Sequence, residues 1–283
     1  MQLVDEYLER LEYLPPAPTV ANQLLGLFGD PDRDLDRIVQ LITYDPSLTA
    51  EVLKRCNSAA LGGAEPIDDM FSAITRLGFY EVYCIVTAMV ASRALAIVPK
   101  GMSFDVSKLW EHSVVTAVAS SSLVSQDGNL EAVAFTSGLL HDVGKLILLA
   151  IEPEPYVELM LKHGPNGPAL VTAELDRFKV THAMIGAQLL TLWKLPASVV
   201  ASVKEHHDSV SDRNSMNELQ LTIHLGNQIA HSLIKDFIDY PERQNEIFLD
   251  LDALKIPREK LPDIEVRIND RLSKVKSLFM QAT

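Results

Sequence analysis

Apolar residues recur every three or four positions along the first third of the chain, which is the spacing of one face of an α-helix. One such stripe consists of Leu35, Ile38, Val39 and Ile42, and another of Ile67, Met70, Phe71, Ile74 and Leu77. Capping residues separate the stripes. Asp34 and the Asp45-Pro46 pair predict helix starts, and Gly78 predicts a helix end. The pattern predicts a stack of short helices.

The segment 80–95 is ambiguous, because its β-branched residues favour a strand while its length and its Ala and Met content favour a buried helix. We predict a helix there. Further helices are predicted at 108–123, 130–150, 169–176, 183–193, 197–206, 217–233 and 261–279. Pro99-Lys100-Gly101 predicts a boundary between an N-terminal lobe, 1–98, and a second lobe, 99–283. No strand alternation bounded by hairpin turns is visible, so the predicted fold class is all-α.

Composition and charge exclude several classes of partner. Hydrophobic residues make up 47% and charged residues 22% of the 283 residues, which is typical of a globular chain. The formal net charge of -13 opposes binding to nucleic acid or to an anionic membrane. The apolar run 82–91 is too short for a membrane span, and the N-terminus does not resemble a signal peptide. We expect a cytoplasmic protein in which Cys56 and Cys84 are buried thiols.

The candidate chemistry lies in five histidines of the second lobe. They are His112, His141, His182, His206 and His207. Asp142 follows His141 directly. A divalent cation takes lone pairs from neutral imidazoles and needs anionic oxygen to offset its charge. Histidines from several helices, together with one His-Asp pair, meet that need inside a helical bundle.

Several short motifs accompany these histidines along the chain. They are Leu14-Pro15-Pro16-Ala17-Pro18, Asp45-Pro46-Ser47-Leu48, Cys56-Asn57-Ser58, Arg76-Leu77-Gly78, Gly138-Leu139-Leu140-His141-Asp142-Val143-Gly144-Lys145-Leu146 and Glu205-His206-His207. With these motifs the chain resembles, from position 14 to about 233, the HDOD (HD-related output domain) family of the HD metal-dependent phosphohydrolase superfamily. The resemblance implies a small N-terminal helical lobe packed on an HD-type helical bundle.

The resemblance also implies a set of metal ligands. By position these are His112, His141 and Asp142, with His182, His206 and His207 as the set for a second metal. The implied cofactor is a divalent metal, either iron, zinc, manganese or magnesium. Asn227 departs from the pattern, because it stands where hydrolases of the superfamily carry a ligand Asp. An amide oxygen can coordinate a cation but contributes no charge. If the chain is active, the resemblance assigns catalysis to Asp142 and Lys145.

Each of these residues also has a purely structural interpretation. Asp142 can pair with Lys145 one helical turn on, with His141 as a satisfied core residue. His206 and His207 can act as imidazolium ions at a helix C-terminus. Asn57-Ser58 can end its helix through side-chain to backbone bonds. For His224 and His231, which lie seven residues apart, packing is the better hypothesis.

Three functions follow. The first is a non-catalytic regulatory or output module of bacterial signal transduction, which the resemblance implies and which binds another signalling protein. The second is a metal-dependent phosphohydrolase acting on a nucleotide or cyclic dinucleotide. The third is a sensor that binds a nucleotide in the cleft without cleaving it, with Lys145 and Arg177 near the phosphate. Asn227 counts against hydrolysis, so we favour the first.

Overall fold

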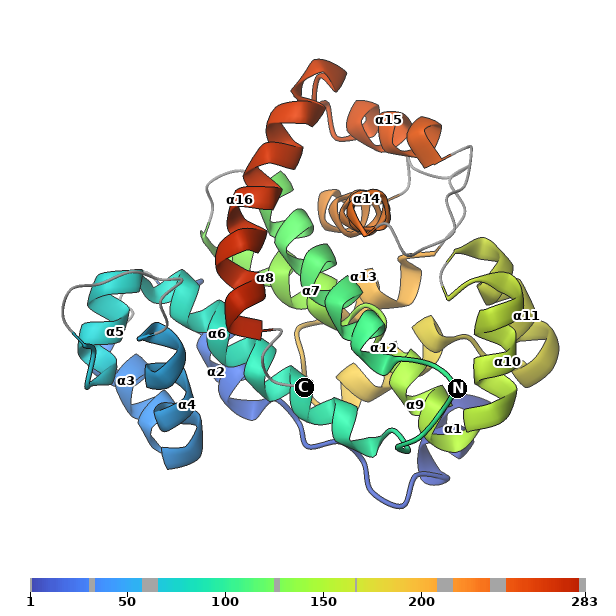
Figure 1. Ribbon diagram of the computed structural model, residues 1–283, viewed down its shortest axis with the longest axis horizontal. Coiled ribbons are helices and arrows are strands. Elements are labelled where there is room, and N and C mark those ends of the chain that lie inside the picture. Colours follow the sequence, from blue (N-terminus) through green and yellow to red (C-terminus); the bar gives the residue numbers. More distant parts are fainter. Residues whose placement is uncertain are drawn as a thin grey trace.

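The computed structural model describes residues 2–30, 34–57, 66–124, 128–165, 167–207, 216–234 and 243–279. Within these ranges every regular element is a helix, and the predicted all-α class is confirmed (Figure 1). The elements of the first part are α1 Gln2–Glu9, α2 Thr19–Gly26, α3 Leu35–Thr43, α4 Pro46–Cys56, α5 Met70–Leu77, α6 Phe79–Ser92 and the 3₁₀ helix η1 Arg93–Ile97. The elements of the second part are α7 Val106–Leu123, α8 Gly128–Leu140, α9 Val143–Ile151, α10 Pro153–His163, α11 Pro168–Phe178, α12 His182–Leu192, α13 Ala197–Glu205, α14 Glu218–Leu233, α15 Arg243–Ala253, η3 Arg258–Lys260 and α16 Leu261–Phe279.

The predicted helix boundaries in the first part are confirmed. The side chain of Asp34 accepts a hydrogen bond from the backbone N–H of Asp36 at 2.9 Å. The side chain of Asp45 accepts one from the N–H of Leu48 at 3.0 Å, with Pro46 in the first helical position. Gly78 ends α5 with φ at 87°, a conformation that favours glycine. The ambiguous segment 80–95 is helical, because α6 is buried on nearly all sides and burial outweighs strand propensity.

Asn57 ends α4 through its side chain, as the structural interpretation predicted. Its Nδ2 donates to the Leu53 carbonyl at 3.0 Å and to the Ile67 carbonyl at 2.6 Å, and its Oδ1 accepts from the Ile67 N–H at 2.6 Å. One amide therefore joins two segments of the chain. Ser58 lies outside the described residues.

The helices pack around a central pair, α7 and α8. α14 and α16 pack against α7, and α1 packs against α12. In Figure 1 α3, α4 and α5 gather at one side of the molecule, while α10 and α11 lie at the opposite side. One hydrophobic core includes buried residues from both sides of 99–101. The predicted lobe boundary stays a prediction.

Among the residues that the structure describes, two helical stretches are long and apolar enough to cross a membrane by length and composition. They are Phe79–Ile97 and Gly128–Ile151, and 61% and 83% of their most apolar windows are buried inside the protein. Burial of this extent is typical of core helices. The cysteines of this core, Cys56 and Cys84, are buried and free, as predicted.

The prediction of one helix over 130–150 is wrong at its centre. α8 ends at Leu140 and α9 begins at Val143, so His141 and Asp142 lie in the turn between them. Two close approaches surround this turn. A Cβ on Gly138 would lie 2.8 Å from the Ala117 Cα, and one on Gly144 would lie 1.9 Å from the His182 carbonyl oxygen. α8 therefore packs tightly on α7, and α9 on α12, and the turn carries the His-Asp pair into the centre of the bundle.

Candidate metal centre

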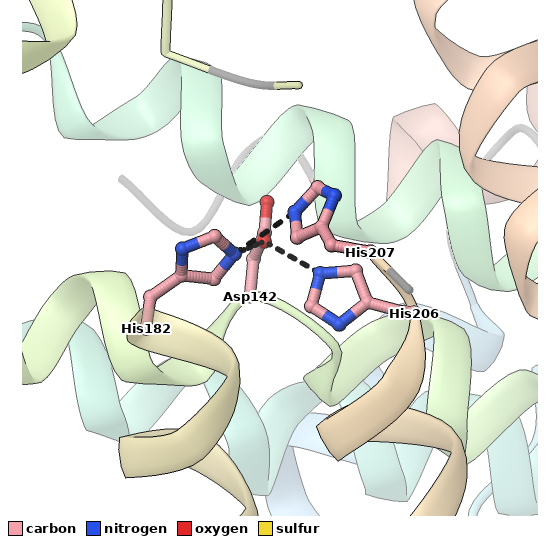
Figure 2. A group of neighbouring side chains, drawn as sticks. All are labelled: Asp142, His182, His206 and His207. Carbon is pink, nitrogen blue, oxygen red and sulfur yellow. Dashed lines mark hydrogen bonds and ion pairs between the residues drawn. The ribbon is translucent and has the colours of Figure 1, made fainter. Parts of the chain in front are cut away.

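Asp142 is surrounded by imidazoles from three helices and from its own turn. Oδ2 lies 3.2 Å from the Nε2 of His141 and 3.9 Å from the Nε2 of His112 on α7. Oδ1 lies 3.3 Å from the Nε2 of His182, the first residue of α12, and 3.5 Å from the Nε2 of His206, the C-cap of α13. Figure 2 shows a ring nitrogen of His182 and one of His206 turned toward the carboxylate.

His207 completes the group, with its Nε2 3.1 Å from the Nε2 of His182 (Figure 2). The structure thus brings together six of the seven residues that the sequence nominated as ligands. They form two groups that share Asp142, and within each group the ligand atoms lie within 4.8 Å of one another. The first group is His112, His141 and Asp142; the second is Asp142, His182, His206 and His207.

Two of the rings are hydrogen-bonded on the side that faces away from Asp142. His141 Nδ1 lies 2.7 Å from the Gly138 carbonyl, and His206 Nδ1 lies 2.6 Å from the Val203 carbonyl. A carbonyl only accepts, so both Nδ1 atoms carry a proton, and in the neutral rings the lone pair is on Nε2 and directed at Asp142. This is the arrangement in which histidines bind metals.

Buried atoms of the cluster that make no hydrogen bond within the described part of the chain include His141 Nε2, His206 Nε2 and Asp142 Oδ1. Buried polar atoms are normally paired, and a bound ion is one explanation when they are not. Lone pairs of two imidazoles and one carboxylate that converge in this way fit a divalent cation. The interpretation of His141 as a core residue accounts for Nδ1, which is bonded to the Gly138 carbonyl, and leaves Nε2 without a hydrogen bond.

The protonation states of three rings suit metal binding, whereas the Glu174 carboxylate raises the pKa of His182 against the effect of burial. Burial lowers the pKa of His206 to about 4. It also lowers the pKa of His112 and of His207 well below the usual range, with neighbouring histidines adding to the effect. These rings are neutral at neutral pH, and the interpretation of His206 and His207 as imidazolium ions is wrong. Burial raises the pKa of Asp142, but His141 and Lys145 outweigh it and the pKa is lowered, so the carboxylate is ionised.

Lys145 pairs with Asp142, as the structural interpretation predicted. Its Nζ lies 2.7 Å from Asp142 Oδ2, and its side chain is fully buried. The carboxylate of the cluster is therefore shared between an ammonium ion at Oδ2 and imidazoles at both oxygens.

Asn227 lies on α14 and is buried, and its Oδ1 makes no hydrogen bond within the described residues. His231 follows one helical turn later and stacks its ring on His112, with the centroids 4.4 Å apart. Residues four apart share a helix face, so Asn227 lies on the side of α14 that faces α7. His224 instead pairs with Asp250, Nδ1 to Oδ2 at 2.7 Å. The packing predicted for His224 and His231 matches these contacts.

The sequence analysis missed Glu174 on α11. Its carboxylate is fully buried and lies 2.8 Å from His182 Nδ1. The signal was present, because Leu170, Glu174 and Phe178 form the buried stripe of α11 at four-residue spacing. A charged residue within such a stripe requires a buried partner. Arg177, considered for phosphate binding, is exposed.

Known proteins resemble this chain in sequence and in fold. A family model described as HDOD domain matches residues 14–209. An uncharacterized protein of Treponema pallidum (strain Nichols) is 27% identical over 202 residues, which is 71% of this chain and 39% of that protein. The chain thus spans about two fifths of the length of that curated relative.

Solved structures share the fold over the whole chain. An HDOD domain protein of unknown function from Geobacter sulfurreducens has a TM-score of 0.73 at 20% identity, covering 99% of this chain and 95% of that one. A protein from Shewanella amazonensis SB2B, described provisionally as a phosphohydrolase, has a TM-score of 0.70 at 24% identity, covering 100% and 97%. A protein from Marinobacter aquaeolei VT8, described provisionally as a signal transduction protein, has a TM-score of 0.73 at 20% identity, covering 100% and 65%.

Proposed function

Because the chain belongs to the HDOD domain family, we propose that it is a signalling module that acts by binding another protein. In this proposal the cluster around Asp142 holds a divalent metal that stabilises one arrangement of the helices. It does not sustain rapid hydrolysis.

The observation that carries the proposal is the charge balance at Asp142. This carboxylate belongs to both candidate ligand groups, and the other members of both groups are histidines. Its Oδ2 is already paired with the Lys145 ammonium at 2.7 Å. Asn227 contributes no second anion where the family resemblance implies a carboxylate. A dication held here is only partly neutralised, which favours modest binding over turnover.

The ligands come from separate parts of the fold, which supports a regulatory role. His112 lies on α7, His182 at the start of α12 and His206 at the end of α13. A cation bound to all three would link these helices and would supply Lewis acidity at the cluster. It shifts the protein between two arrangements only if its affinity for them differs. In this proposal the arrangement that holds the cation presents the surface that the partner binds.

The partner's chemistry follows from the net charge of -13. An acidic surface favours a partner with a basic patch. Association should therefore be faster at low salt and screened above physiological ionic strength.

A second candidate function is a metal-dependent phosphohydrolase acting on a nucleotide or cyclic dinucleotide. The histidine set favours it, because His112, His141, His182, His206 and His207 all lie around Asp142. In this function Asp142 and Lys145 would be the catalytic residues. The absence of a second ligand carboxylate at Asn227 counts against it.

One experiment separates the two functions. The full chain is loaded with Zn²⁺, Mn²⁺ or Fe²⁺ and assayed on cyclic dinucleotides, and it is also used as bait in lysate of its source cell. Asp142→Ala is the test variant, and Asp176→Asn, at an exposed position, is the control. We expect no turnover above background, and a specific protein captured by the wild type and by the control but not by Asp142→Ala. Turnover within the usual range of ~1 to 10³ s⁻¹ that Asp142→Ala abolishes, with no specific partner, would establish the enzyme instead.

A further inference from the structure

Glu174 contacts the candidate metal ligand His182 but is not itself one of the predicted ligands. It lies on α11, which packs with α10 at one side of the molecule (Figure 1). Its side chain is fully buried. A buried carboxylate is stable only when donors surround it. Glu174 has three donors. Tyr156 O–H donates to Oε1 at 2.6 Å, the His182 backbone N–H donates to Oε2 at 2.9 Å, and His182 Nδ1 lies 2.8 Å from each oxygen.

These contacts fix His182 through both its ring and its main chain. Nδ1 donates its proton to Glu174, so in the neutral ring the lone pair is on Nε2, which faces Asp142 Oδ1 at 3.3 Å. The backbone N–H belongs to the first residue of α12 and has no acceptor within its own helix. The same carboxylate satisfies both groups, and a negative charge at a helix N-terminus is favourable. The ring of His182 thus has a defined direction at the edge of the cluster.

The support of His182 differs from that of the neighbouring histidines. The Nδ1 atoms of His141 and His206 donate to backbone carbonyls, which are neutral acceptors. An anionic acceptor makes the opposite ring nitrogen more basic than a neutral acceptor does, and so a stronger ligand. Among these three rings, His182 is the one with such an acceptor.

We propose that Glu174 is a positioning residue for the cluster. Its carboxylate holds His182 with Nε2 toward Asp142 and supplies, through the imidazole, negative charge that Asn227 does not provide. The proposal rests on the proposed metal site, and it explains how a site with one carboxylate ligand keeps useful affinity for a dication. Tyr156 holds Glu174 in turn, and it is fully buried.

The test uses the full chain with three substitutions. Glu174→Gln keeps the shape of the side chain and removes its charge. Tyr156→Phe removes a single hydrogen bond to Glu174 and provides a milder variant if Glu174→Gln fails to fold. Asp176→Asn changes an exposed carboxylate on the same helix and is the matched control.

Two quantities are measured for each variant. The first is the affinity for Zn²⁺ alone, from competition with a chromogenic chelator. Loss of a partner behind a metal ligand weakens metal binding by about 10- to 100-fold, so we expect that loss for Glu174→Gln, a smaller one for Tyr156→Phe and none for Asp176→Asn.

The second quantity is the low-field NMR signal of the His182 Nδ1–H in metal-free protein. We expect Glu174→Gln to shift or abolish it and to leave the corresponding signal of His224, which donates to Asp250, unchanged. A general loss of structure would move both signals.

The outcomes separate the two proposals. Equal Zn²⁺ affinity in wild type and Glu174→Gln, or an unchanged His182 signal, would overturn the role of Glu174. If the wild type binds no Zn²⁺ while Glu174→Gln alters only the His182 signal, the positioning of the ring stands and the proposed metal site fails.

Discussion

Replacing Lys145 with methionine tests the charge balance at Asp142 most directly. Methionine is apolar and close to lysine in length, so the change removes the ammonium ion with little change in volume. In the wild type Nζ lies 2.7 Å from Asp142 Oδ2, with Lys145 fully buried and Asp142 only 3% exposed. Removing one partner of a buried ion pair costs about 3–5 kcal/mol, because it leaves the other charge uncompensated. We expect the metal-free Lys145→Met protein to lose that much free energy of unfolding.

Metal should recover much of this loss. With the ammonium gone, a divalent cation becomes the counter-ion of Asp142, and a ligand at 100 times its Kd stabilises the fold by about 2.7 kcal/mol. The assay is urea unfolding followed by circular dichroism, with and without Zn²⁺, for the wild type, Lys145→Met and the exposed-site control Lys162→Met. Zn²⁺ should raise the free energy of unfolding more in Lys145→Met than in the wild type or in Lys162→Met. A loss below about 1 kcal/mol in metal-free protein, a value typical of exposed pairs, or equal metal effects in all three proteins, would refute this reasoning.

Three further predictions concern packing, pH and charge. Gly144→Ala should destabilise the protein by about 1–3 kcal/mol, because the new Cβ would lie 1.9 Å from the His182 carbonyl oxygen. Gly26→Ala is the control, because a Cβ there would meet no atom within 4 Å. Thermal unfolding of the two variants tests the prediction. Acid should also destabilise the fold, since the pKa of His206 falls from 6.5 to about 4 on folding. Between those two pH values the unfolded chain binds a proton that the folded chain does not. Acidification through this range therefore lowers the free energy of unfolding by about 3 kcal/mol. His182 acts in the opposite sense, because Glu174 outweighs burial and raises its pKa, and the stability that this adds is lost as pH rises through the raised value. His206→Gln should therefore flatten the fall below pH 6.5 in urea titrations, and an unchanged slope would count against the buried neutral ring. Asn227→Asp should tighten Zn²⁺ binding at least about 10-fold by adding an anion. Equal Zn²⁺ affinity in the wild type and the variant would show that residue 227 does not coordinate the metal.

The helices of the first part could be predicted because their signals are local. Asp34, Asp45 and Gly78 act within one helical turn, and the structure shows each of them in the expected role. The break at His141-Asp142 is different. It depends on Gly138 and Gly144 meeting other helices at very short range, and these contacts do not follow from the local sequence.

The candidate site was predicted in part. The order of the histidines and the family resemblance nominated six residues that the fold brings together around Asp142. Glu174 was not nominated, because its role depends on a turn that returns the chain to the start of α12 beside it. Its position within the apolar stripe of α11 was the only local signal. The stacking of His231 on His112 also could not be predicted from the local sequence, because it requires the packing of α14 on α7.

The central claim is that the imidazoles around Asp142 hold a divalent metal. It is tested most directly by element-resolved metal analysis of the full chain, purified without chelator, for the wild type, His141→Ala and the control His163→Ala at the end of α10. The account predicts that the wild type and His163→Ala retain a divalent metal and that His141→Ala loses most of it. Substoichiometric metal that His141→Ala leaves unchanged would contradict the account.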